Sequence, residues 1–548
     1  MTRVLDLADI QGNILSAYGH QGFPRARYIF FHVTEKTFGR DFINALLPKI
    51  TTALRWKSSK NYPGEVLNMK PQVAFNLAFN YRGLQALGLP TETLRAMPTE
   101  FIDGMAARGH ILGDQPERWK DEQQPPVPAH WDTIWRNSKG DKQVHILLSL
   151  NAAIEAPLAA LDDALNWVVT LCTQIGDGIV MLPGHGSDGE LYQDASVLLR
   201  RMPDNAVVPS RREHFGFADG FGDPVFDGQY PPEAVAQAAI GSGKLLPDQT
   251  WAPLATGEFL LGYPDEAQET PGETYPFEFV RNGTFMAYRK LHENVASFQN
   301  FIADTAKTYA RVMGIPNTAV DLEEARETIM AKMAGRWQNG VPLMVAPTYA
   351  ASKAFEAREN TARKNKNYAE LAKIEQEYVD FKYRSDPIGT KCPMTSHMRR
   401  ANPRDGLDPT GDSPNPKRWN GSVLNNRRRI LRRGLPYGVS DPANPDDESE
   451  HGIIFLAVCA SLFRQFEFIQ QQWIQYGLDF NAGNDTCPLL GNHGDDAKFI
   501  IPVDPDSGKS PFVCAKLPQL VEVRGGDYFF IPSMTALRML GMGIVDPT

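Results

Sequence analysis

A strand-and-helix pattern that occurs once in each half of the chain is the feature that most constrains the fold. In the first half, the apolar run 27–33 predicts a strand, and the spacing of apolar residues in 38–50 predicts an amphipathic helix. In the second half, 283–289 predicts a strand and 295–313 predicts a helix. Matching strand–helix units in two halves indicate a duplicated α+β fold.

A second pair of segments extends this pattern. Segment 72–79 reads as a strand before a helical 81–88, and 452–459 reads as a strand before a helical 462–476. Both pairs occupy corresponding places in the two halves, which favours an internal duplication. Further strands expected in the same scheme are 145–150 and 258–263.

The length of 548 residues predicts at least two domains. The Pro- and Gly-rich stretch 224–257 is the expected junction, which gives an N-terminal domain 1–235 and a C-terminal domain 236–548. Charged helix formers fill 352–382 and predict a solvated helical insertion in the second domain. The Pro-, Gly-, Asp- and Asn-rich stretch 402–426 predicts a long surface loop.

Charge and cysteine usage limit the partners and the compartment. A formal net charge of −9 disfavours general binding to nucleic acid. The five cysteines form no C-x-x-C pair, so we expect neither a disulfide framework nor a zinc knuckle. We expect a reducing compartment. No apolar run approaches the roughly 20 residues that span a bilayer, and acids interrupt the first residues. We therefore expect a cytoplasmic protein without membrane or nucleic-acid partners.

Two motifs place polar groups where a ligand could bind. In Gly216-Phe217-Ala218-Asp219-Gly220 an acid lies between glycines, which predicts a carboxylate on a tight loop that approaches a ligand closely. Ordinary turn or cap chemistry is the alternative for Asp219. In the basic run 427–433, strand alternation predicts that Arg432 faces inward while Arg433 faces water. A solvated basic face that binds anions is the alternative for this run.

His397 is the third candidate. It lies in a short segment that is broken by Pro393, with Arg399, Arg400 and Arg404 close behind it. A single imidazole without a neighbouring ligand pattern suits an axial haem position better than zinc or non-haem iron. Arginines are good partners for carboxylates such as haem propionates. A surface or hydrogen-bonded core histidine is the alternative.

Together these three motifs resemble those of the dye-decolorising peroxidase family. The opening segment 9–15 (Asp-Ile-Gln-Gly-Asn-Ile-Leu) is similar to the start of the long-chain branch, and 525–533 is similar to its closing segment. The resemblance implies two ferredoxin-like domains of the dimeric α+β barrel type, with one haem b per chain held mainly by the second domain. The insertion at 352–382 and the loop after His397 depart from shorter members.

The resemblance also implies roles for individual residues. His397 would be the proximal iron ligand, Asp219 the distal acid–base and Arg432 the distal arginine. A carboxylate is expected at the other nitrogen of His397, and Asp485 is the candidate. The residues expected near the haem face, or near its edge and propionates, are Gly220, Phe221, Gly222, Asn402, Pro403 and Arg404.

The function implied is a peroxidase that uses hydrogen peroxide to oxidise bulky donors by one-electron steps. Dyes, phenolics, lignin-related aromatics and Mn²⁺ are the expected donors, and the protein is a monomer or a homo-oligomer. A haem carrier or iron-extracting protein on the same fold is the alternative, since it needs His397 but no distal acid. The third hypothesis is a cofactor-free interaction protein, whose arginine run binds anions or a partner.

Overall fold

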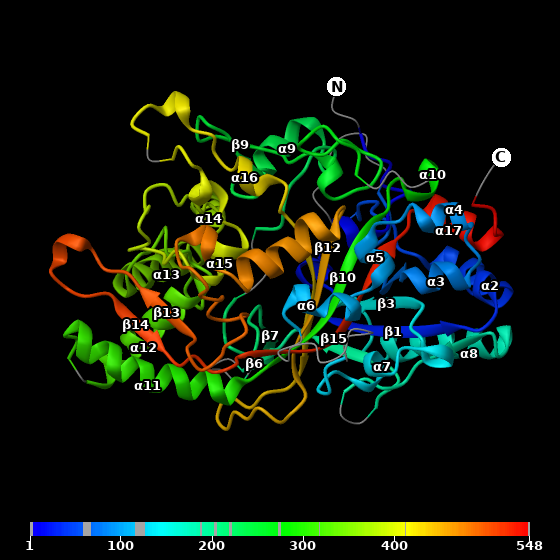
Figure 1. The fold of residues 1–548 in the computed structure, drawn as a ribbon, viewed down its shortest axis with the longest axis horizontal. Helices are drawn as coiled ribbons and strands as arrows, with labels where there is room; N and C mark the ends of the chain where they lie inside the picture. The colour runs from blue at the N-terminus through cyan, green and yellow to red at the C-terminus, as the bar shows by residue number, and fades with distance from the viewer. Residues whose placement is uncertain are drawn as a thin grey trace.

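The computed structural model describes residues 4–57, 67–114, 127–186, 189–201, 205, 207–218, 222–271, 276–316, 318–411 and 413–545. One nine-stranded sheet runs through both halves of the chain, in the order β11-β12-β10-β15-β2-β3-β1-β4, with β5 also paired to β1. Figure 1 shows strands from both halves of the chain near the centre of the molecule, among them β1, β3, β10, β12 and β15. Its strands are β1 Arg25–Val33, β2 Val73–Phe79, β3 Ile146–Ala152, β4 Ile179–Met181, β5 Gln193–Ser196, β10 Thr284–Glu293, β11 Leu431–Gly438, β12 His451–Cys459 and β15 Val521–Ile531.

The sheet consists of two ferredoxin-like halves joined edge to edge. In each half, the strands stand in the order second, third, first, fourth: β2-β3-β1-β4 and β11-β12-β10-β15. All the pairs between these strands are antiparallel. The halves meet where the last strand of one pairs with the second strand of the other, at Phe530 and Phe79. The predicted duplicated α+β fold of two ferredoxin-like domains is confirmed.

The joined sheet curves into a barrel. Strand β5, which pairs with β1, also lies against β11 at the other end of the sheet. Alternate residues of β1 belong to different buried clusters, because successive side chains of a strand point to opposite faces. Tyr28 and Phe30 pack inside the barrel with Tyr288 and Phe529, whereas Ile29 and Phe31 pack outward. The interior is therefore a packed aromatic core.

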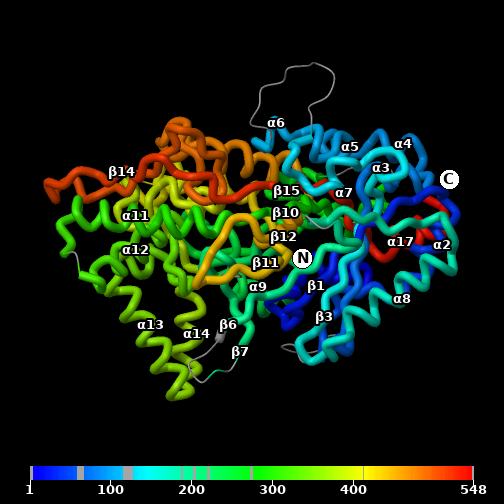
Figure 2. Tube along the Cα trace, turned by 90° about the horizontal axis from the view of Figure 1, so that it is seen from below, coloured from blue at the N-terminus to red at the C-terminus, as the bar shows by residue number. Residues whose placement is uncertain are grey.

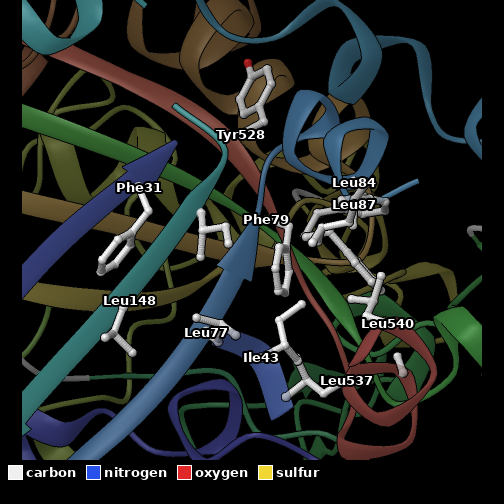
Figure 3. Packing of buried hydrophobic residues seen from close by; sticks show 14 of the residues in the cluster. Phe31, Ile43, Leu77, Phe79, Leu84, Leu87, Leu148, Tyr528, Leu537 and Leu540 are labelled. Carbon is white, nitrogen blue, oxygen red and sulfur yellow. The ribbon is translucent and has the colours of Figure 1, made fainter. Parts of the chain in front are cut away.

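Helices cover the outer face of the first half. Helices α2 (Lys36–Leu46) and α8 (Ala160–Ile175) lie on the sheet together with α3 (Tyr81–Ala86) and the C-terminal α17 (Met534–Met542). Each aliphatic or aromatic side chain buried here stabilises the fold by roughly 1.5–3 kcal/mol. Figure 3 shows helix residues packed on strand residues, among them Ile43, Leu84, Leu537 and Leu540 with Phe31, Leu77, Phe79 and Leu148.

The second half carries a larger helical layer. It contains α11 (Val295–Met313), α12 (Ala319–Ala334), and two π-helical segments, η8 (Leu462–Glu467) and η9 (Ile469–Ile474). A hairpin of β13 (Lys498–Ile501) and β14 (Phe512–Ala515) packs against α11. Shorter helices are α1 Gly12–Leu15, α4 Thr91–Arg95, α5 Thr99–Asp103, α6 Gly109–Leu112, α7 Thr133–Arg136, α9 Pro232–Ala238, α10 Phe277–Val280, α15 His397–Ala401 and α16 Val423–Asn426; shorter strands are β6 Leu199–Arg201, β7 Val207–Pro209, β8 Lys244–Leu245 and β9 Trp251–Ala252.

The charged insertion is helical, as predicted, and its two helices form a hairpin. Helices α13 (Tyr349–Lys364) and α14 (Tyr368–Glu377) project from the second half (Figure 2). Arg358 joins them through ion pairs with Glu370 at 2.7 Å and Glu377 at 2.9 Å. The hairpin has exposed charges and ion pairs between its own helices, as expected for a solvated element.

Several predicted elements agree closely with the structure. The segment 27–33 lies within β1, 283–289 coincides with the start of β10, and the helix 295–313 is α11 to the residue. The predicted correspondence between 72–79 and 452–459 is wrong. The first is β2, the second strand of its half, whereas the second is β12, a third strand whose counterpart is β3.

Two further predictions are corrected. Segment 258–263 is not a strand: it follows the 3-10 turn Thr256–Glu258, and Gly262 has a positive φ of 82° that ends any extended run. Its apolar residues are buried in a turn instead. The stretch 402–426 is not a plain surface loop, because Arg404, Asp405 and Asn425 within it are buried.

The boundary at 235/236 stays a prediction, since one sheet joins both halves. No helix in the described ranges combines the length and the apolar character needed to cross a membrane.

Candidate active site

A cavity of about 1020 Å³ lies between the sheet of the second half and its helical layer. The sheet contributes side chains from β10, β11 and β12, and the helical layer contributes α15, η8 and η9. Such a large and mainly apolar space suits a bulky ligand. Residues that define it include Arg289, Leu291, Arg432, Gly434, Ile453, Phe455, His397, Met398, Phe466, Ile469 and Ile474.

His397 begins the five-residue helix α15 and lines this cavity. Its Nδ1 lies 3.3 Å from the sulfur of Cys487. Cys487 is fully buried, and this burial raises the pKa of its thiol. Since Cys487 contacts Nδ1, Nε2 is the nitrogen that would bind a metal.

Arg399 and Arg400 hold α15 in place. Arg399 pairs with the Asp386 carboxylate at 3.1 Å and donates to the Cys392 carbonyl at 2.7 Å. Arg400 donates to four backbone carbonyls, those of Thr395, Trp473, Tyr476 and Asp485. Both side chains are buried. The expectation that they serve as partners for propionates is therefore corrected: they are cross-links that fix the helix carrying His397.

The structure gives Asp485 a different environment from the one expected. Its carboxylate pairs with Lys498 at 2.8 Å, and its backbone carbonyl accepts a hydrogen bond from Arg400 at 2.7 Å. The side chain that contacts Nδ1 of His397 is Cys487, two residues further along. Sequence reasoning missed Cys487 because it considered only carboxylates as partners for the imidazole.

The loop that carries Asp219 is described only at its two ends, since Asp219, Gly220 and Phe221 lie outside the described residues. On the incoming side, the Glu213 carboxylate accepts hydrogen bonds from the backbone of Phe215 at 2.7 Å and Phe217 at 2.6 Å. Ala218 donates its N–H to the Gln338 carbonyl at 2.9 Å. Phe217 and Ala218, the last described residues before Asp219, both line the cavity.

On the outgoing side, Asp223 ties the loop to β11. Its carboxylate accepts from the backbone N–H of Arg432 at 3.3 Å and from the Arg433 guanidinium at 2.7 Å. Gly222 precedes it with a φ of 75°, a conformation that favours glycine. The segment that follows the first motif is thus bonded to the strand that carries the second. Asp223 stands beside the Gly-Phe-Ala-Asp-Gly motif, yet only the structure reveals its partners.

Arg432 and Arg433 point to opposite faces of β11, as alternation predicts, but Arg433 does not face water. Both arginines border the cavity. Arg433 is buried and donates to the carbonyls of Asn13 and Ile14, each at 2.7 Å. The expectation fails because the N-terminal segment covers the other face of the strand. A cation that loses its water in this way needs such acceptors.

Gly434, on the same strand as Arg432, also lines the cavity. Its φ is 110°, and a Cβ at this position would collide with the backbone oxygen of Ile454 on β12. The close approach of β11 to β12 therefore requires glycine here.

Asn402, Pro403 and Arg404 are not among the described residues that line the cavity. The Arg404 guanidinium donates to the carbonyls of Val379 at 2.7 Å and Gly241 at 2.8 Å. Its donors thus hold neighbouring backbone, and their expected contact with a propionate gains no support from this geometry. Arg336, which the sequence did not single out, is buried and lines the cavity. It is the better candidate for binding an anionic edge group.

Known families place this arrangement in context. Residues 9–175 match the family model described as the DyP dimeric alpha+beta barrel domain. Peroxidase 2 of Mycetinis scorodonius is 26% identical over 97% of this chain and 87% of that protein. Residues 9–175 therefore form a dye-decolorising peroxidase domain, and the chain is similar to curated peroxidases of this family over nearly its whole length. Two solved structures share its fold. An ancestral D-type dye-decolorising peroxidase has a TM-score of 0.70 at 24% identity, with 98% of this chain and 99% of that one covered. A dye-decolorising peroxidase in complex with 2,6-dimethoxyphenol has a TM-score of 0.67 at 23% identity, with 98% and 100% covered.

This dye-decolorising peroxidase is a hydrogen-peroxide-dependent oxidoreductase, and its cofactor is a haem. The residues present fit that group. A single imidazole on the cavity wall matches a haem ligand. The apolar lining matches a porphyrin, and the lining arginines Arg336 and Arg432 match its carboxylates and a bound anion.

Proposed function

We propose that this chain binds one haem b through His397 and uses it to oxidise dyes and phenolic donors with hydrogen peroxide, by one-electron steps. The observation that carries the proposal is a single cavity lined by His397, Arg432 and the residues that lead into Asp219. A phenolic molecule bound to a protein of the same fold supports aromatic donors.

Each residue has a separate task. The haem supplies, when bound, the iron that binds peroxide and stores the oxidising equivalents. Asp219 accepts the proton of the peroxide and returns it to the departing oxygen, so that water leaves. Arg432 stabilises the negative charge that develops as the O–O bond breaks. His397 would hold the iron. Asp223 keeps the Asp219 loop and the Arg432 strand together.

An aspartate base predicts activity in acid. The ordinary pKa of aspartate is about 3.9, so its carboxylate still accepts protons in mildly acidic solution, where a histidine base would be protonated. We expect donor oxidation to be fastest below neutral pH. A pH–rate profile with its maximum above pH 7 would remove Asp219 from this role.

The test compares haem-loaded variants by stopped-flow absorption after one equivalent of hydrogen peroxide. Asp219→Asn and Arg432→Leu are expected to keep the Soret band but to respond to peroxide about 10²–10⁴-fold more slowly. His397→Ala is expected to lose haem. Exposed Arg358→Met, on α13, serves as the control that leaves the reaction unchanged.

Two results would contradict the proposal. If all three variants responded as fast as the parent, the assigned roles would be wrong. If the parent bound haem but its Soret band did not respond to peroxide, the protein would be a haem carrier.

A further inference from the structure

The side chain behind the proximal histidine is a thiol. His397 Nδ1 and Cys487 Sγ are 3.3 Å apart, while the carboxylate two residues away, on Asp485, pairs with Lys498. When Nε2 of a histidine binds a metal, Nδ1 carries the proton and donates it to whatever acceptor stands behind the ring. Here the acceptor is sulfur.

Cys487 is held rigidly at this position. Its N–H donates to the Ile474 carbonyl at 2.7 Å, and its own carbonyl accepts from Gly491 at 2.9 Å and from the His493 ring at 3.0 Å. The sulfur also accepts from the N–H of Leu490 at 3.5 Å. The side chain is fully buried. The thiol therefore has one orientation toward the imidazole, and the contact belongs to the packed core of the second half.

The identity of this acceptor affects the metal. A strong acceptor at Nδ1 makes the imidazole more basic, and a more basic axial ligand stabilises ferric over ferrous iron. A thiol sulfur is a weak acceptor in comparison with a carboxylate or a hydroxyl oxygen. Sulfur at this position thus leaves the imidazole closer to its neutral character.

We propose that Cys487 is a positioning residue whose sulfur accepts a weak hydrogen bond from Nδ1 of His397. The iron would then be more easily reduced than with an oxygen atom as the acceptor at Nδ1. This rests on the proposed function, because it requires that His397 bind the haem iron. It assigns a role to a residue that takes no part in proton transfer and touches neither peroxide nor donor.

The experiment uses haem-loaded protein and two readouts that do not depend on turnover. They are the midpoint potential of the Fe(III)/Fe(II) couple by spectroelectrochemistry and the Fe–His stretching frequency of the ferrous form by resonance Raman. In Cys487→Asp we expect a lower potential and a higher stretching frequency than in the parent. In Cys487→Ser, which is nearly the same size, we expect shifts in the same directions but smaller.

Cys514→Ser is the matched control, since Cys514 is buried in the same cluster and its backbone lies on β14. We expect both of its readouts to equal those of the parent. If Cys487→Ser and Cys487→Asp kept an intact Soret band and had the midpoint potential and the Fe–His stretching frequency of the parent, the role of Cys487 would be overturned. The proposed function would still stand. If His397→Ala kept the Fe–His band of the parent, His397 would not be the ligand, and both proposals would fall.

Discussion

Single buried charges decide how the walls of the cavity are built. Arg433 has a side-chain exposure of only 4%, and Asp223 compensates its charge while also accepting from the Arg432 backbone. One carboxylate thus bonds the segment at Asp223 to the strand that carries Arg432 and Arg433. Removing one partner of a buried charge pair leaves the other without compensation, and this loss is larger than the net contribution of the pair.

Asp223→Ala should therefore weaken both stability and catalysis. We expect a loss of about 1–3 kcal/mol in the free energy of unfolding, because Arg433 keeps its carbonyl partners. The peroxide response should slow in addition, since the loop is no longer tied to β11. Urea unfolding and stopped-flow absorption measure the two effects. Asp223→Asn, which keeps an acceptor, should lie between the variant and the parent; a parent-like Asp223→Ala would show that the tie is dispensable.

At the scale of elements, α15 is too short to hold its own geometry. A five-residue helix gains little from its internal hydrogen bonds. Arg400 compensates by bonding four carbonyls from three other parts of the chain, including the end of η9 and the loop that carries Cys487. His397 is therefore positioned by its neighbours in space and not by its own helix.

Arg400→Met should loosen the haem site before it unfolds the protein. The four carbonyls would lose a charged donor, which we expect to cost about 2–4 kcal/mol of stability. Haem affinity should fall because His397 is no longer fixed, and haem transfer to an excess of apomyoglobin measures it. Arg311→Met, which removes an exposed arginine from α11, is the control and should change neither quantity. Unchanged haem affinity in Arg400→Met would mean that α15 is fixed by packing alone.

For the molecule as a whole, the barrel core sets a limit on acid tolerance. Burial lowers the pKa of His145 and of His185 to about 3 and that of His214 to about 4. Each of these rings is neutral in the folded protein but protonates near pH 6.5 when the chain unfolds. Their contribution to stability is complete above pH 6.5 and is lost progressively as the pH falls toward 3–4. Acid thus favours the proposed reaction but weakens the fold.

The prediction concerns His185, whose ring stacks on Phe30 with centroids 5.3 Å apart. From pH 6.5 to pH 5 each such histidine should cost up to about 2 kcal/mol of stability. His185→Phe should therefore lose less stability than the parent over this interval, as measured by urea unfolding at both pH values. His110→Phe, at an exposed position, is the control. An equally steep loss in His185→Phe and in the parent would exclude this histidine as a source of acid sensitivity.

Local pattern was enough to determine several elements. The helix Val295–Met313 was predicted to the residue, because its apolar spacing and the glycine that follows it depend only on neighbouring positions. The strands β1, β10 and β12 were predicted within a few residues for the same reason. His397 and Arg432 were identified by their motifs, and the structure places both on one cavity.

Only the tertiary structure decided which polar groups face one another. Alternation predicts that Arg433 faces solvent, but the N-terminal segment covers it. The sequence suggests that Arg399 and Arg400 bind anions, but both donate to backbone carbonyls. The partner of His397 could not be read from spacing, because Cys487 lies 90 residues away and meets the ring only through the packing of η9. Periodicity records the faces of an element. It does not record what covers each face, and at a site built from distant segments that covering sets the chemistry.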